Sequence, residues 1–136
     1  MGITAGSNGT RVLVVDDESA ICRALEIVFS RAGYDVTTVE TGRAAEDLLR
    51  TEHFDCMIVD LLLKDTRGDV LFHLACAIQP HLTHQTIFTT GDFTDYAQDL
   101  IDACRCPMLA KPFELRELLF MVERATGGRR ARGASA

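Results

Sequence analysis

Five short apolar runs, each followed by a segment with helical periodicity, constrain the fold of this chain more than any other feature. The runs are Val12–Val15, the more polar Val36–Val39, Cys56–Val59, Ile87–Thr89 and Met108–Ala110. Such short, unbroken runs predict strands that are covered on both faces, as in a parallel sheet. The alternation of strand and helix therefore predicts an α/β fold with helices on both faces of the sheet.

Between these runs, apolar residues recur at the 3.6-residue period of an amphipathic helix. Helices are expected over about 19–32, after Thr41, after Asp69, over about 95–104 and over about 114–126. Thr41, Asp69 and Thr94 are each placed to cap the helix that follows. Because the run at 36–39 is polar enough for a sheet edge, we expect a flavodoxin-like, doubly wound, five-stranded parallel sheet with strand order 2-1-3-4-5 and five helices.

Composition and charge narrow the class of protein. One domain is expected over 11–126, between flexible ends at 1–10 and 127–136. The net charge of −6 disfavours general binding to nucleic acid or to anionic membranes. No apolar run reaches the ~18 residues of a membrane span, and no signal peptide is evident. The five cysteines, an odd number, indicate reduced core thiols in the cytoplasm, and Cys104 and Cys106 fit that role better than metal binding.

Polar residues stand directly after four of the predicted strands. Asp16 and Asp17 follow the first strand, Asp60 follows the third, Thr90 ends the fourth and Lys111 follows the fifth. Each of them alone is as easily explained as an ordinary loop residue. Because the carboxyl ends of parallel strands share one edge of the sheet, the set predicts a functional crevice between the first and third strands.

The charges at this edge predict a metal site. Two carboxylates ~4 Å apart repel by about 4 kcal/mol at an effective dielectric constant near 20. One lysine offsets part of the charge of three carboxylates, and a hard divalent cation with oxygen ligands, Mg²⁺, offsets the rest. A carboxylate beside Mg²⁺, a hydroxyl and a lysine is equipped to attack phosphorus and to form an aspartyl phosphate.

These residues resemble the receiver domains of bacterial two-component response regulators, over about residues 11–126. The matching pieces are the acidic pair in VVDDE, Asp60, Gly68 eight residues later, Thr90, and the sequence Lys111-Pro112-Phe113. Each piece is weak alone, but the ordered set at these spacings is specific to the family.

The resemblance implies a role for each matched residue. Asp60 would accept a phosphoryl group from a phosphohistidine of a partner kinase. Mg²⁺ would be bound by the side chains of Asp17 and Asp60, by the backbone carbonyl of Leu62, and by Asp16 through water. Lys111, whose bond to Pro112 is expected to be cis, would pair with the phosphoryl oxygens.

The resemblance also implies a switch. Thr90 would swing inward to the phosphoryl group and repack the surface formed by the fourth helix, the fifth strand and the fifth helix. The implied partners are a sensor histidine kinase or phosphotransfer protein and an unknown downstream protein target, with a phosphorylation-dependent dimer left open. Neither direct nucleic-acid binding nor membrane insertion is expected. No enzymatic activity is expected beyond Mg²⁺-dependent self-phosphorylation from a donor and slow autodephosphorylation.

Several positions depart from the common family pattern. Lys64 stands where proline is usual, so the loop after Asp60 has less intrinsic rigidity. Arg67 replaces a frequent Asp before Gly68, and Met108 replaces an aromatic residue that is often coupled to Thr90 in switching. Leu62 and Asp92 flank the phosphoryl site and influence how readily water attacks the phosphoryl group.

Two other functions compete with this interpretation. A phosphatase of the haloacid dehalogenase kind would need an Asp two residues after the nucleophile, where this chain has Leu62. A receiver-like module that only binds protein is disfavoured because Asp16, Asp17, Asp60, Thr90 and Lys111 are all present.

The four histidines are expected in surface or packing roles. A partner surface could be formed by Tyr96, Leu100 and Ile101 on the fourth helix. The alternative is that Leu100 and Ile101 face the sheet as part of the core.

Overall fold

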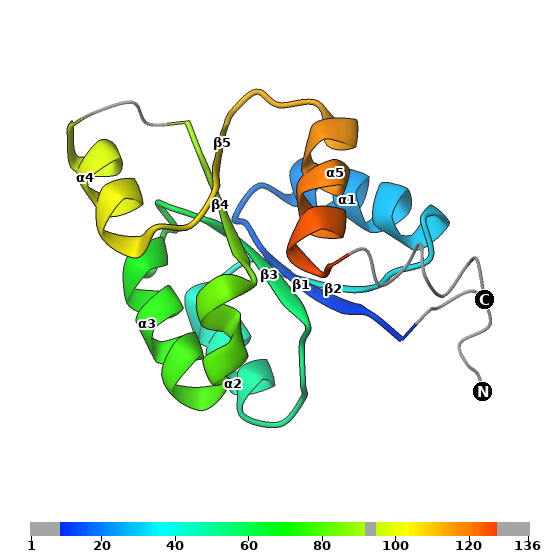
Figure 1. The fold of residues 1–136 in the computed structure, drawn as a ribbon, viewed down its shortest axis with the longest axis horizontal. Helices are drawn as coiled ribbons and strands as arrows, with labels where there is room; N and C mark the ends of the chain where they lie inside the picture. The colour runs from blue at the N-terminus through cyan, green and yellow to red at the C-terminus, as the bar shows by residue number, and fades with distance from the viewer. Residues whose placement is uncertain (1–8, 92–94, 128–136) are drawn as a thin grey trace.

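The computed structural model describes residues 9–91 and 95–127, except for the side chains of residues 95, 96 and 101. Its strands form one parallel sheet in the order β2-β1-β3-β4-β5, which confirms the predicted topology (Figure 1). The strands are β1 (Arg11–Val15), β2 (Asp35–Val39), β3 (Cys56–Asp60), β4 (Thr86–Thr90) and β5 (Met108–Ala110). The helices are α1 (Ser19–Arg31), α2 (Gly42–Leu49), α3 (Gly68–Ile78), α4 (Asp95–Cys104) and α5 (Leu115–Ala125), with a short 3₁₀ helix, η1 (Pro80–His84).

Side chains alternate along the strands, so each strand contributes to two cores. In β1, Val12 and Val14 pack with α1 and α5, whereas Leu13 and Val15 pack on the opposite face with α2 and α3. Figure 1 shows α1 and α5 together on one side of the sheet and α2 and α3 on the other. Since both faces are covered, the strands can be apolar throughout, and polar groups are left to their ends.

The helix starts confirm one predicted cap and correct another. The hydroxyl of Thr41 accepts a hydrogen bond from the Ala44 backbone N–H at 3.1 Å, as predicted. Asp69, by contrast, is not a cap, because α3 begins one residue earlier, at Gly68, and the N-cap residue is Arg67. The carboxylate of Asp69 instead pairs with the Arg67 guanidinium at 2.9 Å. Thr94 and most of the predicted flexible ends lie outside the described residues.

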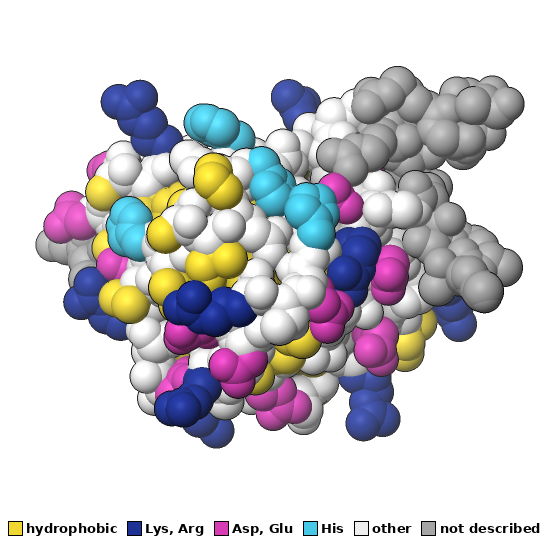
Figure 2. Space-filling view, turned by 90° about the horizontal axis from the view of Figure 1, so that it is seen from below, with side chains coloured by type: hydrophobic (Ala, Val, Ile, Leu, Met, Phe, Trp, Pro, Cys, Tyr) yellow, Lys and Arg dark blue, Asp and Glu magenta, His cyan; other side chains and the backbone are white. Residues whose placement is uncertain are grey.

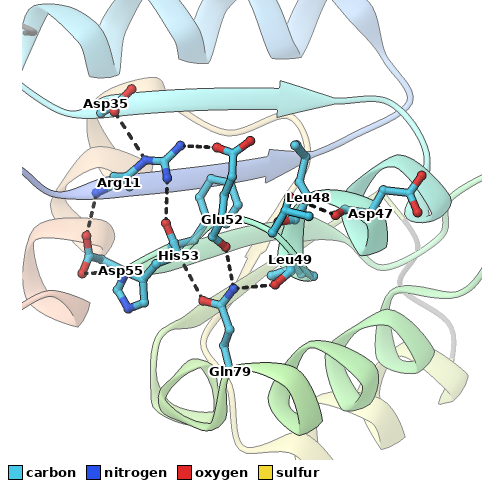
Figure 3. A network of polar contacts seen from close by, with 11 residues as sticks. Arg11, Asp35, Asp47, Leu48, Leu49, Glu52, His53, Asp55 and Gln79 are labelled. Atoms are coloured by element: carbon cyan, nitrogen blue, oxygen red, sulfur yellow. Dashed lines mark hydrogen bonds and ion pairs between the residues drawn. The ribbon is translucent and has the colours of Figure 1, made fainter. Parts of the chain in front are cut away.

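Buried polar contacts tie the sheet together at the amino ends of the strands (Figure 3). The amide of Gln79, the residue after α3, accepts a hydrogen bond from Phe54 N–H at 3.1 Å and donates to the carbonyls of Leu49 at 2.9 Å and Glu52 at 2.7 Å. Gln79 thereby fixes the connection between α2 and β3 by satisfying three backbone groups that would otherwise lack a partner.

Arg11 links the same connection to the start of β1. Its guanidinium pairs with Glu52 at 2.6 Å and donates to the carbonyl of His53 at 3.0 Å, and its backbone N–H donates to the Asp55 carboxylate at 2.7 Å. A longer contact of 3.4 Å reaches Asp35 at the start of β2. Three separate segments therefore meet at one side chain.

All four histidines are exposed, as predicted, and several gather on the face shown in Figure 2. The rings of His53 and His81 stack with their centroids 4.7 Å apart. His81 Nε2 lies 2.6 Å from the carbonyl oxygen of Phe54. Within the described part of the chain, no helix combines the length and the apolar character that crossing a bilayer requires.

Replacing Gln79 tests the contribution of this end of the molecule. We expect Gln79→Ala to lower the free energy of unfolding by about 2–4 kcal/mol, because it leaves three backbone groups without their partner. Arg50→Ala, which removes an exposed i,i+4 ion pair with Glu46, serves as the control and should cost less than about 0.5 kcal/mol. Urea unfolding measures both values, and equal losses for the two variants would show that the Gln79 bonds contribute nothing beyond a surface contact.

Candidate functional site

Three carboxylates meet where β1 and β3 end side by side. Asp16 and Asp17 directly follow β1, and Asp60 is the last residue of β3. One oxygen from each of the three carboxylates lies within 4.8 Å of the others. The register aligns Val15 with Val59, so the two neighbouring strands deliver their acids to the same level of the sheet edge. This edge is the topological switch point of the fold.

Lys111, which follows β5, crosses this edge and contacts three acids. Its Nζ lies 2.8 Å from Asp60 Oδ2, 3.0 Å from Asp16 Oδ2 and 2.8 Å from Glu18 Oε1. Burial alone would lower the pKa of Lys111, but the hydrogen bonds to these carboxylates outweigh it and raise the pKa above its ordinary value. The ammonium is therefore charged at every physiological pH and is the one cation among the described residues that contacts both Asp16 and Asp60.

Asp16 is the most buried acid of the group, with 3% of its surface exposed. Burial raises its pKa, although the hydrogen bond from the Glu18 backbone N–H at 2.9 Å and the contact with Lys111 act in the opposite direction. A carboxylate in such surroundings gains from a second nearby cation. The donor set consists of oxygens from Asp16, Asp17 and Asp60, which is the chemistry that Mg²⁺ prefers, so these residues fit the predicted ion.

Thr90 and the segment after β5 complete the edge. Asp60 is aligned with Thr89 in the register of β3 and β4, which places Thr90 one residue beyond the acid. Thr90 is buried, and its carbonyl accepts a hydrogen bond from the Lys111 backbone N–H at 2.7 Å. The bond between Lys111 and Pro112 is cis, as the resemblance implied.

The loop after Asp60 is closed by backbone contacts. Leu62 N–H donates to Asp60 Oδ1 at 3.1 Å, and Gly68 N–H donates to the Leu61 carbonyl at 2.6 Å. A Cβ at Gly68 would lie 2.6 Å from the Asp60 carbonyl oxygen and 2.9 Å from Leu61 Cα, which no side chain tolerates. The glycine eight residues after the acid is therefore required by this close approach.

Sequence reasoning missed one residue of the site. Glu18 follows the acidic pair directly, yet only the structure shows that its side chain joins Asp16 and Asp60 on Lys111. Its position next to the pair was the available signal. Asp92 lies outside the described residues, and the side chains of Tyr96 and Ile101 are likewise not described. Leu100 is half-buried and packs against the core, which favours the core role for that residue.

Known proteins that are similar to this chain point to one family. The sequence model of the family described as "Response regulator receiver domain" matches residues 12–123. The response regulator receiver protein CpdR of Brucella abortus is 31% identical over 115 residues, which cover 84% of this chain and 94% of that protein. The alginate biosynthesis transcriptional regulatory protein AlgB of Pseudomonas putida is 37% identical over 110 residues. That match covers 80% of this chain and 24% of AlgB, so the chain spans about a quarter of the length of that relative.

Solved structures agree on the fold. A CheY-like response regulator receiver domain protein from Methanospirillum hungatei superposes with a TM-score of 0.81 at 22% identity, covering 90% of this chain and 98% of that one. A response regulator protein from Burkholderia pseudomallei superposes with a TM-score of 0.75 at 25% identity, covering 92% of this chain and 73% of that one. The latter crystal structure contains a phosphorylated aspartic acid, a calcium ion and citrate.

Lys111→Met tests the electrostatic account of the site. In the presence of a chelator we expect this variant to lose about 2–4 kcal/mol of unfolding free energy, because Asp16 and Asp60 lose their shared cation. Millimolar Mg²⁺ should then raise the Tm of the variant more than that of the wild type, since it would supply the missing positive charge. Lys64→Met, at an exposed position, is the matched control. Identical melting curves for the two variants would contradict the account.

Proposed function

The chain belongs to the response regulator receiver domain family, and from this premise we propose that it is a signalling switch set by phosphorylation of Asp60. The observation that carries the proposal is the shared contact of Lys111 with Asp60 and Asp16, next to Asp17. The receiver domain would extend over 11–126 and act in the cytoplasm. Its phosphodonor would be a phosphohistidine on a sensor kinase or on a phosphotransfer protein.

The transfer step follows from the positions of these groups. A carboxylate oxygen of Asp60 attacks phosphorus, the P–N bond to the donor imidazole breaks, and the imidazole leaves with that electron pair and takes up a proton. Lys111 already lies 2.8 Å from Asp60 Oδ2, so its charge would stabilise the equatorial phosphoryl oxygens as they gain negative charge.

The residues proposed to bind Mg²⁺ are Asp17 and Asp60 through their side chains, Leu62 through its carbonyl, and Asp16 through water. When bound, the ion would neutralise charge on the carboxylates and on the phosphoryl oxygens. Three described carboxylates at one edge and the all-oxygen donor set support this assignment. The related Burkholderia protein, whose crystal structure contains a phosphorylated aspartic acid and a calcium ion, also supports a hard cation as the ligand.

Thr90 would couple the phosphoryl group to the surface formed by α4, β5 and α5. It pairs with Ala110 in the register of β4 and β5, so a movement of Thr90 acts directly on β5. Met108 is half-buried on β5 and stands where many relatives have an aromatic residue. Its flexible side chain can repack in place of that ring. A changed α4-β5-α5 surface would dock a downstream protein or a second copy of the chain.

A mass measurement tests the proposed phosphoacceptor. Incubation with a small phosphodonor and Mg²⁺ should add one acid-stable, base-labile phosphoryl group to the wild type. Asp60→Asn and added chelator should each abolish the gain, because they remove the nucleophile and the cation. Asp47→Asn, an exposed acid on α2, should be labelled like the wild type.

Three results would overturn the proposal in different ways. An unlabelled wild type, under conditions that label other receivers, would favour a module that only binds protein. Steady turnover of free phosphate esters would favour a phosphatase. Equal labelling of Asp60→Asn would place the phosphoryl group on another residue.

A further inference from the structure

The loop between β3 and α3, residues 61–67, carries the proposed metal ligand Leu62 and is attached to a helix that is remote from the site in sequence. The two oxygens of the Asp65 carboxylate accept hydrogen bonds from the backbone N–H groups of Gly42 at 2.9 Å and Arg43 at 3.1 Å. These donors belong to the first turn of α2. The hydrogen bond from Gly42 lowers the pKa of Asp65 below its ordinary value, so the carboxylate is ionised at neutral pH.

Every backbone N–H group at the start of α2 has its own hydrogen-bond acceptor. Asp65 takes those of Gly42 and Arg43, the Thr41 hydroxyl takes that of Ala44, and the Thr41 carbonyl takes that of Ala45. The N–H groups of Gly42, Arg43 and Ala44, which have no acceptor within the helix, are thus divided between the cap residue Thr41 and Asp65 of the loop.

Close packing beside Asp65 reinforces the attachment. A Cβ at Gly42 would clash with the methyl group of Thr66, so the glycine lets α2 approach the loop without displacing that side chain. Farther along, a hollow of about 530 Å³ lies between α2 and α3, lined in part by Asp65, Thr66, Val70 and Leu74. Next to this hollow, the Asp65 carboxylate supplies two polar contacts between the loop and α2.

The residues next to Asp65 give the β3–α3 loop little rigidity of their own. Lys64 occupies the position where the family usually has proline, and it is exposed. On its other side the loop is closed by the contact of Leu63 N–H with the Thr66 carbonyl at 3.1 Å and by the short pairing of Leu62 with Arg67. These local contacts set the shape of the loop. Leu61 and Leu63 bury its first half in the core, and Asp65 ties its outer half to the first turn of α2.

We propose that Asp65 is a positioning residue that anchors the β3–α3 loop on the first turn of α2 and thereby holds the Leu62 carbonyl in place for Mg²⁺. The inference rests on the proposed function, because it takes Leu62 as a metal ligand. It also links α2 to the phosphorylation site, so that any shift of the loop moves the start of that helix.

The test compares two variants that remove different acceptors from the same helix start. Asp65→Ala removes the anchor, whereas Thr41→Ala removes the cap of α2 and leaves the loop contacts in place. Calorimetric titration with Mg²⁺ should give about tenfold weaker binding for Asp65→Ala, the lower end of the loss seen when a residue that orients metal ligands is removed. Thr41→Ala should bind within twofold of the wild type. Asp65→Asn, which keeps one acceptor oxygen, should lie between Asp65→Ala and the wild type.

A second measurement, without metal, separates failure of this inference from failure of the proposed function. Amide hydrogen exchange at Leu63 and Gly68 should be faster in Asp65→Ala than in the wild type and unchanged in Thr41→Ala. Equal effects of the two variants on Mg²⁺ binding and exchange, or no effect of Asp65→Ala, would overturn the positioning role. A wild type that binds no Mg²⁺ would refute the proposed metal site, and the exchange rates would still decide whether Asp65 holds the loop.

Discussion

The repulsion among carboxylates at the carboxyl edge of the sheet, and its relief by Lys111, is the interaction on which the rest of the site depends. Asp16 and Asp60 are both more than nine-tenths buried, and each lies within about 3 Å of the same ammonium. Lys111 is placed there by β5, which is separated from β1 by two other strands. The site is therefore a product of the strand order, and it exists only when the whole sheet has formed.

The two ends of the sheet differ in how their charges are balanced. At the amino ends, the side chains of Gln79 and Arg11 make complementary contacts with the backbone and with acids of neighbouring segments. At the carboxyl ends, three acids share one lysine, so the group keeps a net negative charge. One end can thus stabilise the fold, while the other, under the proposed function, would respond to a cation or a phosphoryl group. This division matters for the proposed function, because the uncompensated carboxylates are the groups that a bound cation would neutralise.

The sequence predicted those parts of the site that depend only on where a residue stands relative to the end of a strand. Asp16, Asp17, Asp60 and Lys111 could be brought together because each directly follows an apolar run, or ends it, and parallel strands end at one edge. Contacts that depend on the detailed packing of loops could not be predicted. The cap predicted at Asp69 was wrong because α3 begins earlier, at Gly68, and the Asp69 carboxylate pairs with Arg67. Likewise, nothing in the local sequence indicates that Asp65 reaches α2 or that Gln79 reaches the connection after α2. The position of Glu18 beside the acidic pair is a signal, but it does not show that the side chain reaches Lys111.

The most direct test of the account is a Mg²⁺ titration of the isotopically labelled protein, followed by backbone amide chemical shifts. If the carboxylates and Lys111 form one cation-responsive site, the largest shifts should fall on residues 16–18, 60–63 and 111, with saturation at a single affinity. They should be absent in Asp60→Asn. Shifts of equal size spread over the acidic surface, or the same shifts in Asp60→Asn, would contradict the claim that these residues act together around one ion.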